Sequence, residues 1–341
     1  MQWTRRSADV GRIKPPLAET RIAHPAPRAA GTRPNPAPHP RDNSVMKTPL
    51  ATTSPPGTRA TATDKRKAFR RLLAGRDCVR AATAFDPLSA LAAQELGYPA
   101  GILAGSIASL SVLGAPDIAL LTLTELVEQA RRICRVSDLP LLVDGDHGYG
   151  NALNVRRTVT DLEAAGIAAL TIEDTLLPAA YGAGASAQLI SLGEAAGKLR
   201  AAVDARTDPE LVLIGRTHAA LSRDRADLLA RQAALESAGI DALFITGLQD
   251  PTDLDALAAQ ATVPLILGSA VPGLELADLA QRKVRICLQG HAAFYQAFKA
   301  LYANLSSLRG GESAAEETPQ ELVKRLSGVE RHGAWAEDFL G

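Results

Sequence analysis

This chain of 341 residues has few cysteines, no excess of either charge and no long apolar runs. The three cysteines, Cys78, Cys134 and Cys287, are far apart and each lies among apolar neighbours, which favours small buried side chains over disulfides or metal ligands. Basic and acidic side chains number 37 each, and no predicted helix face carries a basic stripe, so we expect no nucleic-acid partner. No apolar run reaches about 18 residues, so we expect no membrane span.

Residues 1–65 lack the apolar periodicity of a folded segment. Their run AHPAPRAAGTRPNPAPHPRD is rich in proline, alanine and arginine, so it cannot bury enough apolar surface to offset the entropy of an ordered chain. We therefore predict a disordered leader over residues 1–65. The only methionines are Met1 and Met46, and we expect Met46, just ahead of the folded region, to be the start or the leader to be dispensable. Because no signal peptide is recognisable, we expect a cytoplasmic protein.

Short apolar runs alternate with helical patterns over residues 66–341. Continuous apolar runs of this kind are typical of parallel strands that are covered on both faces. The helical patterns carry start signals, such as Thr122 with glutamate three residues later, Asn154 and Ser222. The eight predicted strands begin at Val79, Ala100, Leu139, Ala168, Leu211, Asp241, Pro264 and Val284.

This alternation predicts an α/β fold, a (β/α)₈ TIM barrel that forms one catalytic domain over residues 66–341. A doubly wound sheet is the alternative arrangement of such units. However, no glycine-rich dinucleotide fingerprint follows the first predicted strand, which favours the barrel.

The third predicted strand ends in two carboxylates, Asp144 and Asp146, within the stretch LLVDGDHGYGN. Side chains two residues apart on a strand point the same way, and barrel chemistry lies at the carboxyl ends of the strands. Two like charges that are held close in a dehydrated site are costly unless a cation neutralises them. The pair therefore predicts a site for Mg²⁺ or Mn²⁺, which prefer carboxylate oxygens and water.

Other predicted strands also end in polar side chains, which we expect to gather at the same rim of the barrel. One such cluster would be typical of a solvated strand end. Together with Asp144 and Asp146 of the third strand, however, the set comes from five strands, which favours an active site. These further strand-end residues are Ser106, Glu173, Asp174, Arg216, Thr217 and His291.

The stretches VDGDHGYGN, TIEDTLLP, GRTH and AGSIASLSVLGAPDIALLTLTEL resemble the isocitrate lyase/phosphoenolpyruvate mutase superfamily. The likeness covers about residues 66–341, and it is closest to the oxaloacetate decarboxylase branch. The resemblance implies that Asp144 is the direct Mg²⁺ ligand and that Asp146 and Glu173 hold metal-bound waters. Mn²⁺ is the alternative ion.

The resemblance also implies roles for three residues at the substrate, a small α-keto acid. Ser106, with the backbone amides near it, would contact the oxalyl end of the acid. Arg216 would bind its carboxylate and stabilise the developing enolate oxygen. His291 matches a histidine that the decarboxylase branch uses at the substrate, so Arg216 and His291 are the implied catalytic residues.

The implied reaction is Mg²⁺-dependent decarboxylation of oxaloacetate, or of a close β-keto acid, to pyruvate and carbon dioxide through an enolate held at the metal. Another superfamily C–C or C–P bond enzyme is one alternative, such as a 2-methylisocitrate-type lyase or a phosphonopyruvate enzyme. A catalytically inactive barrel with a binding role is the other. The lyases carry a K-[KR]-C-G-H loop after the fourth strand, whereas this chain reads LLPAAYGAGASAQL there. The alanine, glycine and serine content of residues 179–186 suggests a flexible lid.

Two positions depart from the superfamily pattern. His218 stands where relatives commonly have asparagine, and Gln289 stands where they commonly have asparagine before Gly-His. The amphipathic C-terminal segment follows the last barrel helix, and the family commonly exchanges such a helix between subunits. We therefore expect a homo-oligomer, a tetramer or dimer, with a swapped C-terminal helix.

Overall fold

The computed structural model describes residues 59–182, 187–310 and 317–341, which all fall in the compact unit Pro49–Gly341. The first helix, α1 (Ala62–Ala74), begins inside the predicted leader, where Thr61 caps it and Asp64 completes a capping box. Lys65 is buried, so the boundary predicted after residue 65 is too late. The rest of the predicted leader, residues 1–58, lies outside the described residues.

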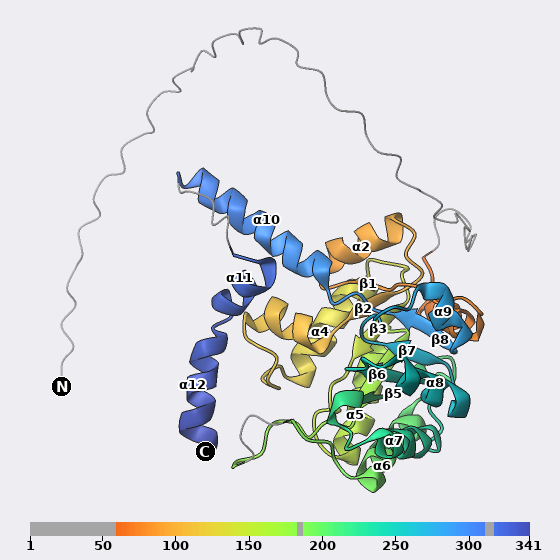
Figure 1. Ribbon diagram of the computed structural model, residues 1–341. Coiled ribbons are helices and arrows are strands. Elements are labelled where there is room, and N and C mark those ends of the chain that lie inside the picture. Colours follow the sequence, from red (N-terminus) through yellow and green to blue (C-terminus); the bar gives the residue numbers. More distant parts are fainter. Residues whose placement is uncertain (1–58, 183–186, 311–316) are drawn as a thin grey trace, which may run out of the picture. The chain divides into compact units, whose positions relative to one another are not determined.

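Eight strands form one parallel sheet in the order of the sequence, which confirms every predicted strand (Figure 1). Val79, just before the first strand, also forms a parallel bridge to Ile286 of the last strand. Its amide donates to Arg285 O and its carbonyl accepts from Cys287 N, both at 2.9 Å, so the two edges of the sheet are joined. The strands are β1 (Ala82–Thr83), β2 (Gly101–Leu103), β3 (Leu141–Asp144), β4 (Ala169–Glu173), β5 (Val212–His218), β6 (Ala242–Thr246), β7 (Leu265–Leu267) and β8 (Val284–Cys287).

Helices follow the strands, and short polar side chains set where they begin. The predicted capping box at Thr122 and Glu125 is present. The prediction was wrong for two other caps, since Asn151 and Asp224 cap the helices in place of Asn154 and Ser222. The helices are α2 (Pro87–Glu95), α3 (Gly105–Ala108), η1 (Ser109–Leu113), α4 (Leu123–Cys134), α5 (Ala152–Ala165), α6 (Leu192–Ala205), η2 (Ala219–Leu221), α7 (Arg225–Glu236), α8 (Pro251–Gln260) and α9 (Leu276–Gln281).

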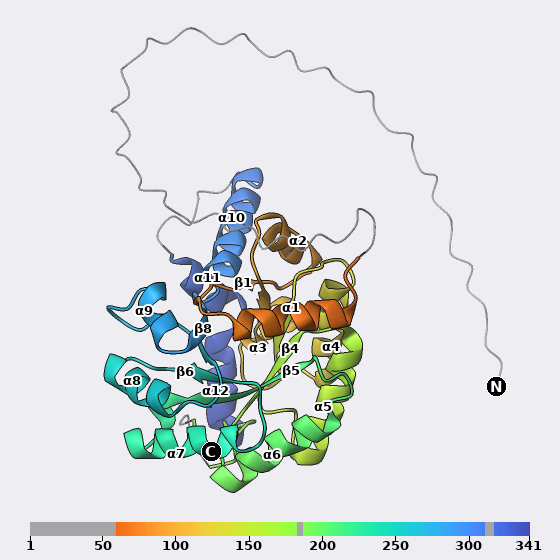
Figure 2. The ribbon, with the colours of Figure 1, turned by 90° about the vertical axis from the view of Figure 1, so that its right-hand side faces the viewer.

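Helix α1 covers the end of the barrel at which the strands begin (Figure 2). Phe69 and Leu73 of α1 pack into the cluster of buried side chains inside the sheet, with Leu142, Ile214 and others. Arg66 Nε donates to Ile167 O, just before β4, and Arg70 Nε donates to Glu210 O, just before β5, each at 3.0 Å. With this end closed, the opposite rim, where the strands end, is left for chemistry.

Three helices follow the last strand: α10 (Ala292–Leu308), α11 (Pro319–Leu326) and α12 (Val329–Leu340). Phe294 of α10 is buried with Phe85 and Ile107. Beyond this contact the three helices expose large apolar side chains: Leu301, Leu305, Leu308, Leu326, Trp335 and Phe339. Among the described residues, no helix is both long enough and apolar enough to cross a membrane.

Candidate active site

Asp144 closes β3 and is buried at the rim of the barrel. Thr171 Oγ1 donates to Asp144 Oδ1 at 2.8 Å, and Arg216 Nη1 donates to Asp144 Oδ2. Burial acts to raise the pKa of Asp144, but the Arg216 charge and these hydrogen bonds outweigh it and lower the pKa below its usual value. Asp144 is therefore held as a carboxylate. Thr171, in the middle of an apolar strand, was not identified from the sequence.

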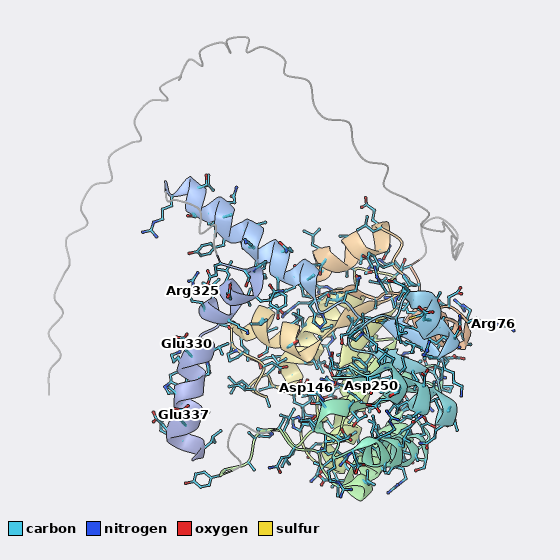
Figure 3. The ribbon with its side chains drawn as sticks, viewed as in Figure 1. Arg76, Asp146, Asp250, Arg325, Glu330 and Glu337 are labelled. Carbon is cyan, nitrogen blue, oxygen red and sulfur yellow. The ribbon has the colours of Figure 1, made fainter. Side chains whose placement is uncertain are left out.

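Asp146 lies beside Asp144, as predicted, but it is not part of the strand as the prediction assumed. The strand stops at Asp144, and Asp146 lies in the following turn with a left-handed φ of 46°. Its side chain rests against the backbone of Gly105, where a Cβ atom would lie 2.1 Å from Asp146 Oδ1. Burial, then the charges of Asp144, Asp117 and Glu173, raises the pKa of Asp146 well above its usual value. The turn, not strand alternation, brings these like charges together. Asp146 is labelled among the side chains in Figure 3.

Arg216 on β5 lies between two of these carboxylates. It is the register partner of Glu173 on β4, and Arg216 Nε lies 3.2 Å from Glu173 Oε2. The same guanidinium pairs with Asp144, and it lies over the ring of Phe244 at 5.6 Å. Burial raises the pKa of Glu173 to about 7, with Arg216 opposing this and Asp144 adding to it. One buried cation thus spans two acids whose charges repel.

Asp174 and Thr217, which the sequence grouped with the rim residues, point away from it. Asp174 Oδ2 accepts from Thr217 Oγ1 and from Arg231 Nη1 of α7, each at 3.0 Å. Asp174 is 1% exposed. Neighbours on a strand face opposite sides, so Glu173 turns to the rim while Asp174 ties the sheet to an outer helix.

His291 follows β8 with a left-handed φ of 60° and precedes α10. Its Nδ1 lies 3.0 Å from Thr83 Oγ1 on β1, a residue that was not identified from the sequence. Burial lowers the pKa of His291, while Asp144 opposes and Arg216 reinforces that shift, so both charges act on the ring. Ser106 lies in the first turn of α3, directly after β2, and is half-buried.

The two departures from the superfamily pattern have different surroundings. His218 ends β5 two residues after Arg216, and its ring lies against Gly247, where a Cβ would come within 2.2 Å of His218 Cε1. Gln289 is exposed. With its amide oxygen toward Arg80, Gln289 accepts from Arg80 Nη1 at 2.9 Å and from Nε at 3.0 Å. Neither residue belongs to the carboxylate cluster, which consists of Asp144, Asp146 and Glu173.

The carboxylate cluster fits a divalent ion that keeps most of its water. Among the residues that the structure describes, no three His, Cys, Asp or Glu side chains converge closely enough to hold an ion directly. Asp144, Asp146 and Glu173 nevertheless interact electrostatically with one another. Mg²⁺ commonly takes one or two protein carboxylates and fills its other positions with water and substrate oxygens.

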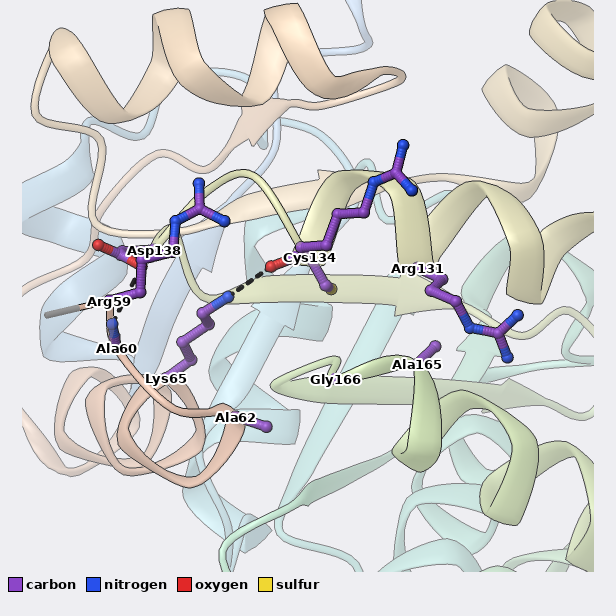
Figure 4. Close-up of a pocket in the computed structure, with 10 residues that line it drawn as sticks. Arg59, Ala60, Ala62, Lys65, Arg131, Cys134, Asp138, Ala165 and Gly166 are labelled. Carbon is purple, nitrogen blue, oxygen red and sulfur yellow. Dashed lines mark hydrogen bonds between the residues drawn. The ribbon is translucent and has the colours of Figure 1, made fainter.

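A separate cavity of about 240 Å³ lies near the start of β3, on the side covered by α1 (Figure 4). Arg59, Lys65, Arg131 and Asp138 are among the residues that line it. Lys65 Nζ donates there to Cys134 O at 2.7 Å and to Ser137 O at 2.6 Å. None of the predicted site residues lines this cavity.

Comparison with known proteins connects this geometry to a family. The family model described as phosphoenolpyruvate phosphomutase matches residues 69–309. An oxaloacetate decarboxylase of Rhodopseudomonas palustris (strain BisB5) is 52% identical over 287 residues, which are 82% of this chain and 97% of the relative. An oxaloacetate decarboxylase of Bradyrhizobium diazoefficiens is 50% identical over 267 residues, which are 78% of this chain and 90% of the relative.

Solved structures give the same assignment. Oxaloacetate acetylhydrolase in complex with 3,3-difluorooxalacetate aligns with a TM-score of 0.67 at 26% identity, over 82% of this chain and 98% of that one. Phosphonopyruvate hydrolase in complex with oxalate and Mg²⁺ aligns with a TM-score of 0.64 at 31% identity, over 81% and 99% of the two chains. The resemblance seen in the sequence is confirmed: the chain belongs to the phosphoenolpyruvate phosphomutase family and is an enzyme similar to the oxaloacetate decarboxylases.

Proposed function

We propose that this enzyme decarboxylates oxaloacetate, or a close β-keto acid, to pyruvate and carbon dioxide with the help of Mg²⁺ or Mn²⁺. The observation that carries the proposal is Arg216 paired with both Asp144 and Glu173 at the rim where the strands end. Relatives that are about half identical to this chain bear the name oxaloacetate decarboxylase, which supports the same substrate.

In this proposal Asp144 is the direct metal ligand, and Asp146 and Glu173 hold the ion through water. Burial and then the neighbouring carboxylates raise the pKa values of Asp146 and Glu173, and a cation at this place would relieve the repulsion between these carboxylates. The chemistry that Mg²⁺ or Mn²⁺ supplies when bound here is Lewis-acid polarisation of the oxygens of the keto acid.

Arg216 stabilises the negative charge that develops as the bond between C3 and C4 of the substrate breaks. The electron pair of that bond moves toward the keto oxygen, carbon dioxide leaves, and the enolate of pyruvate remains. A guanidinium held in place by Asp144 and Glu173 needs no reorganisation as this charge grows, so its stabilising effect is large. The Ser106 hydroxyl and the backbone amides of α3 hold the other end of the acid.

The enolate must then gain a proton at C3 to give pyruvate. We assign His291 to this part of the site, because Asp144 and Arg216 both act on its ring and Thr83 orients it through Nδ1. A neutral histidine with one nitrogen fixed by a hydroxyl leaves its other nitrogen free to face the substrate.

We also propose a homo-oligomer, a dimer or a tetramer, in which the C-terminal helices pack on another subunit. The apolar side chains of α10 to α12 support this, since Leu305 is 56% exposed, Leu308 is 78% exposed and Phe339 is 72% exposed. Large apolar side chains that are exposed on one chain are commonly covered in subunit contacts. The molar mass of the full chain by light scattering tests it, and a monomer would contradict it.

The decisive experiment is pyruvate release from oxaloacetate by the purified full chain, with Mg²⁺ and with a chelator. Oxaloacetate decays by itself in the presence of metal, so an Asp144→Ala protein is the control. Release that needs both Mg²⁺ and Asp144 supports the proposal. Release no faster than the control would overturn it.

In that second outcome, phosphonopyruvate and 2-methylisocitrate are the next substrates to try. The similarity to phosphonopyruvate hydrolase, at 31% identity, makes the first of these the stronger alternative.

A further inference from the structure

Three successive carbonyl groups in the turn after β3 are each held by a different element. Asp146 O accepts from the amide of Glu173 on β4 at 2.8 Å. His147 O accepts from Lys198 Nζ on α6 at 3.0 Å, and Gly148 O accepts from Thr158 Oγ1 on α5 at 3.0 Å. The turn that presents Asp146 is therefore fixed from three sides.

Lys198 is the least expected of these partners. It is 4% exposed, and its ammonium group donates to the backbone carbonyl of His147. Within the described part of the chain, no carboxylate lies within ion-pair distance of its ammonium group, although Glu194 and Glu173 act on it from farther away. Burying a lysine without a close counter-charge is costly, and an apolar side chain would fill the same space at lower cost. Packing alone does not account for a lysine here.

The turn itself needs such support. A left-handed backbone is uncommon for a residue that carries a Cβ atom, and Asp146 adopts one with φ 46°. Gly145 and Gly148, which flank this residue in the turn, are closely packed against their neighbours. A Cβ at Gly145 would lie 2.8 Å from Thr171 O, and one at Gly148 would lie 2.4 Å from Val155 Cγ2. Small shifts of this turn would move the Asp146 carboxylate directly.

We propose that Lys198 is a positioning residue for the divalent-cation site, acting through His147 O to hold Asp146 beside Asp144 and Glu173. The inference rests on the proposed function, since it assumes that these carboxylates bind a cation. Mutation of a group that orients a metal-binding side chain from behind commonly lowers metal affinity by about 10- to 100-fold.

The chain offers a matched control. Lys65 is also a buried lysine, 6% exposed, and it too donates to backbone carbonyls, those of Cys134 and Ser137. It lies by the cavity on the side covered by α1, away from the carboxylates (Figure 4). Lys198→Met and Lys65→Met each remove one buried ammonium group, and only the first touches the turn.

The experiment measures Mn²⁺ binding to the full chain by electron paramagnetic resonance, with thermal unfolding of each protein alongside. We expect both variants to unfold at lower temperature than wild type. Lys198→Met should bind Mn²⁺ about 10- to 100-fold more weakly, whereas Lys65→Met should bind it as wild type does. If Lys198→Met does not fold, Lys198→Leu, which also lacks a donor for His147 O, gives the same comparison.

Three outcomes would overturn the inference, and they are distinguishable. Wild-type Mn²⁺ affinity in a folded Lys198 variant, with normal binding by wild type, would overturn the positioning role alone. A wild-type protein that binds no Mn²⁺ would overturn the metal proposal together with this inference. An equal loss of Mn²⁺ affinity in Lys65→Met would show a general effect of lost stability, and so would also contradict the role of Lys198.

Discussion

Glu173 and Arg216 face each other as register partners on adjacent strands, with Arg216 Nε 3.2 Å from Glu173 Oε2. The other arm of the same guanidinium reaches Asp144, two strands away from Arg216. A planar fork can satisfy two carboxylates in different directions at once, which a single ammonium group cannot do. This geometry makes the identity of the cation, and not only its charge, important.

Arg216→Lys should therefore lose most of the activity while keeping the positive charge. A lysine can pair with Asp144 or with Glu173 but cannot span both, so it will not be aimed at the developing charge of the substrate. We expect kcat/KM for oxaloacetate to fall about 10²-fold or more. Steady-state pyruvate release at saturating Mg²⁺ measures this, and wild-type kcat/KM in the variant would contradict the role of Arg216.

Gly105→Ala should damage the site without unfolding the protein. The added Cβ would lie 2.1 Å from Asp146 Oδ1, and that oxygen is the end of a side chain that can rotate away. Asp146 would then be displaced by about 1 Å, which commonly costs about 10²-fold in rate. Activity and urea unfolding should be measured on the same preparation.

Gly193→Ala in α6 is the control for this change. Among the described residues, and apart from its chain neighbours and the backbone of its own helix, no atom lies within 4 Å of the position that its Cβ would take. This variant should keep full activity and gain about 0.4–1 kcal/mol in the free energy of unfolding, because alanine restricts the unfolded chain. Equal activity in the two glycine variants would show that the contact between Gly105 and Asp146 is unimportant.

The three cysteines should be inert in the folded protein. Burial, with a contribution from Cys287, raises the pKa of Cys78 from 9.0 to about 12, and burial raises that of Cys134 to about 11, although Lys65 and Arg66 oppose it. The thiolate is the reactive form, so a thiol reagent at about pH 8 should modify the native protein slowly and the denatured protein fast. Rapid labelling of the native protein would contradict the burial of these thiols.

The same shifts set a direction for stability at alkaline pH. Because the pKa of the Cys78 thiol is higher in the folded state, the thiol contributes fully to the free energy of unfolding below pH 9.0, its value in the unfolded chain. This contribution is lost as the pH rises through the pKa of the folded state. The free energy of unfolding should therefore fall above pH 9.0, and it should fall less steeply in Cys78→Ala. Urea unfolding over a pH series measures both.

Arg66→Met should destabilise the whole domain. Arg66 is buried and donates to Ile167 O at 3.0 Å, to Glu163 O at 2.6 Å and to Asp208 Oδ2 at 2.6 Å. Removing it takes one donor from each of these acceptors and the paired cation from the Asp208 carboxylate, so we expect a loss of about 3–5 kcal/mol in the free energy of unfolding. Arg157→Met is the control: that side chain is 68% exposed and pairs with Asp161 of its own helix, so about 0.5 kcal/mol or less should be lost.

Local patterns in the sequence were enough to predict the strands and the residues at their ends. An apolar run between helical segments has one low-energy environment, a parallel strand covered on both faces, so all eight strands could be located without contacts. The position of Asp144 and of Arg216 at strand ends followed from the same runs. Capping by Thr122 was predictable because a capping box is complete within four residues.

Contacts between distant segments decided the rest. Glu173 and Asp174 are adjacent in the sequence, yet one faces Arg216 and the other faces Arg231 on an outer helix. Asp146 has a left-handed backbone, and its side chain lies against Gly105 of another element. Lys198 holds His147 O across 51 positions of the chain. Periodicity reports which face of an element is apolar, but a hydrogen bond between two elements exists only after both have docked, so only the tertiary structure could show these partners.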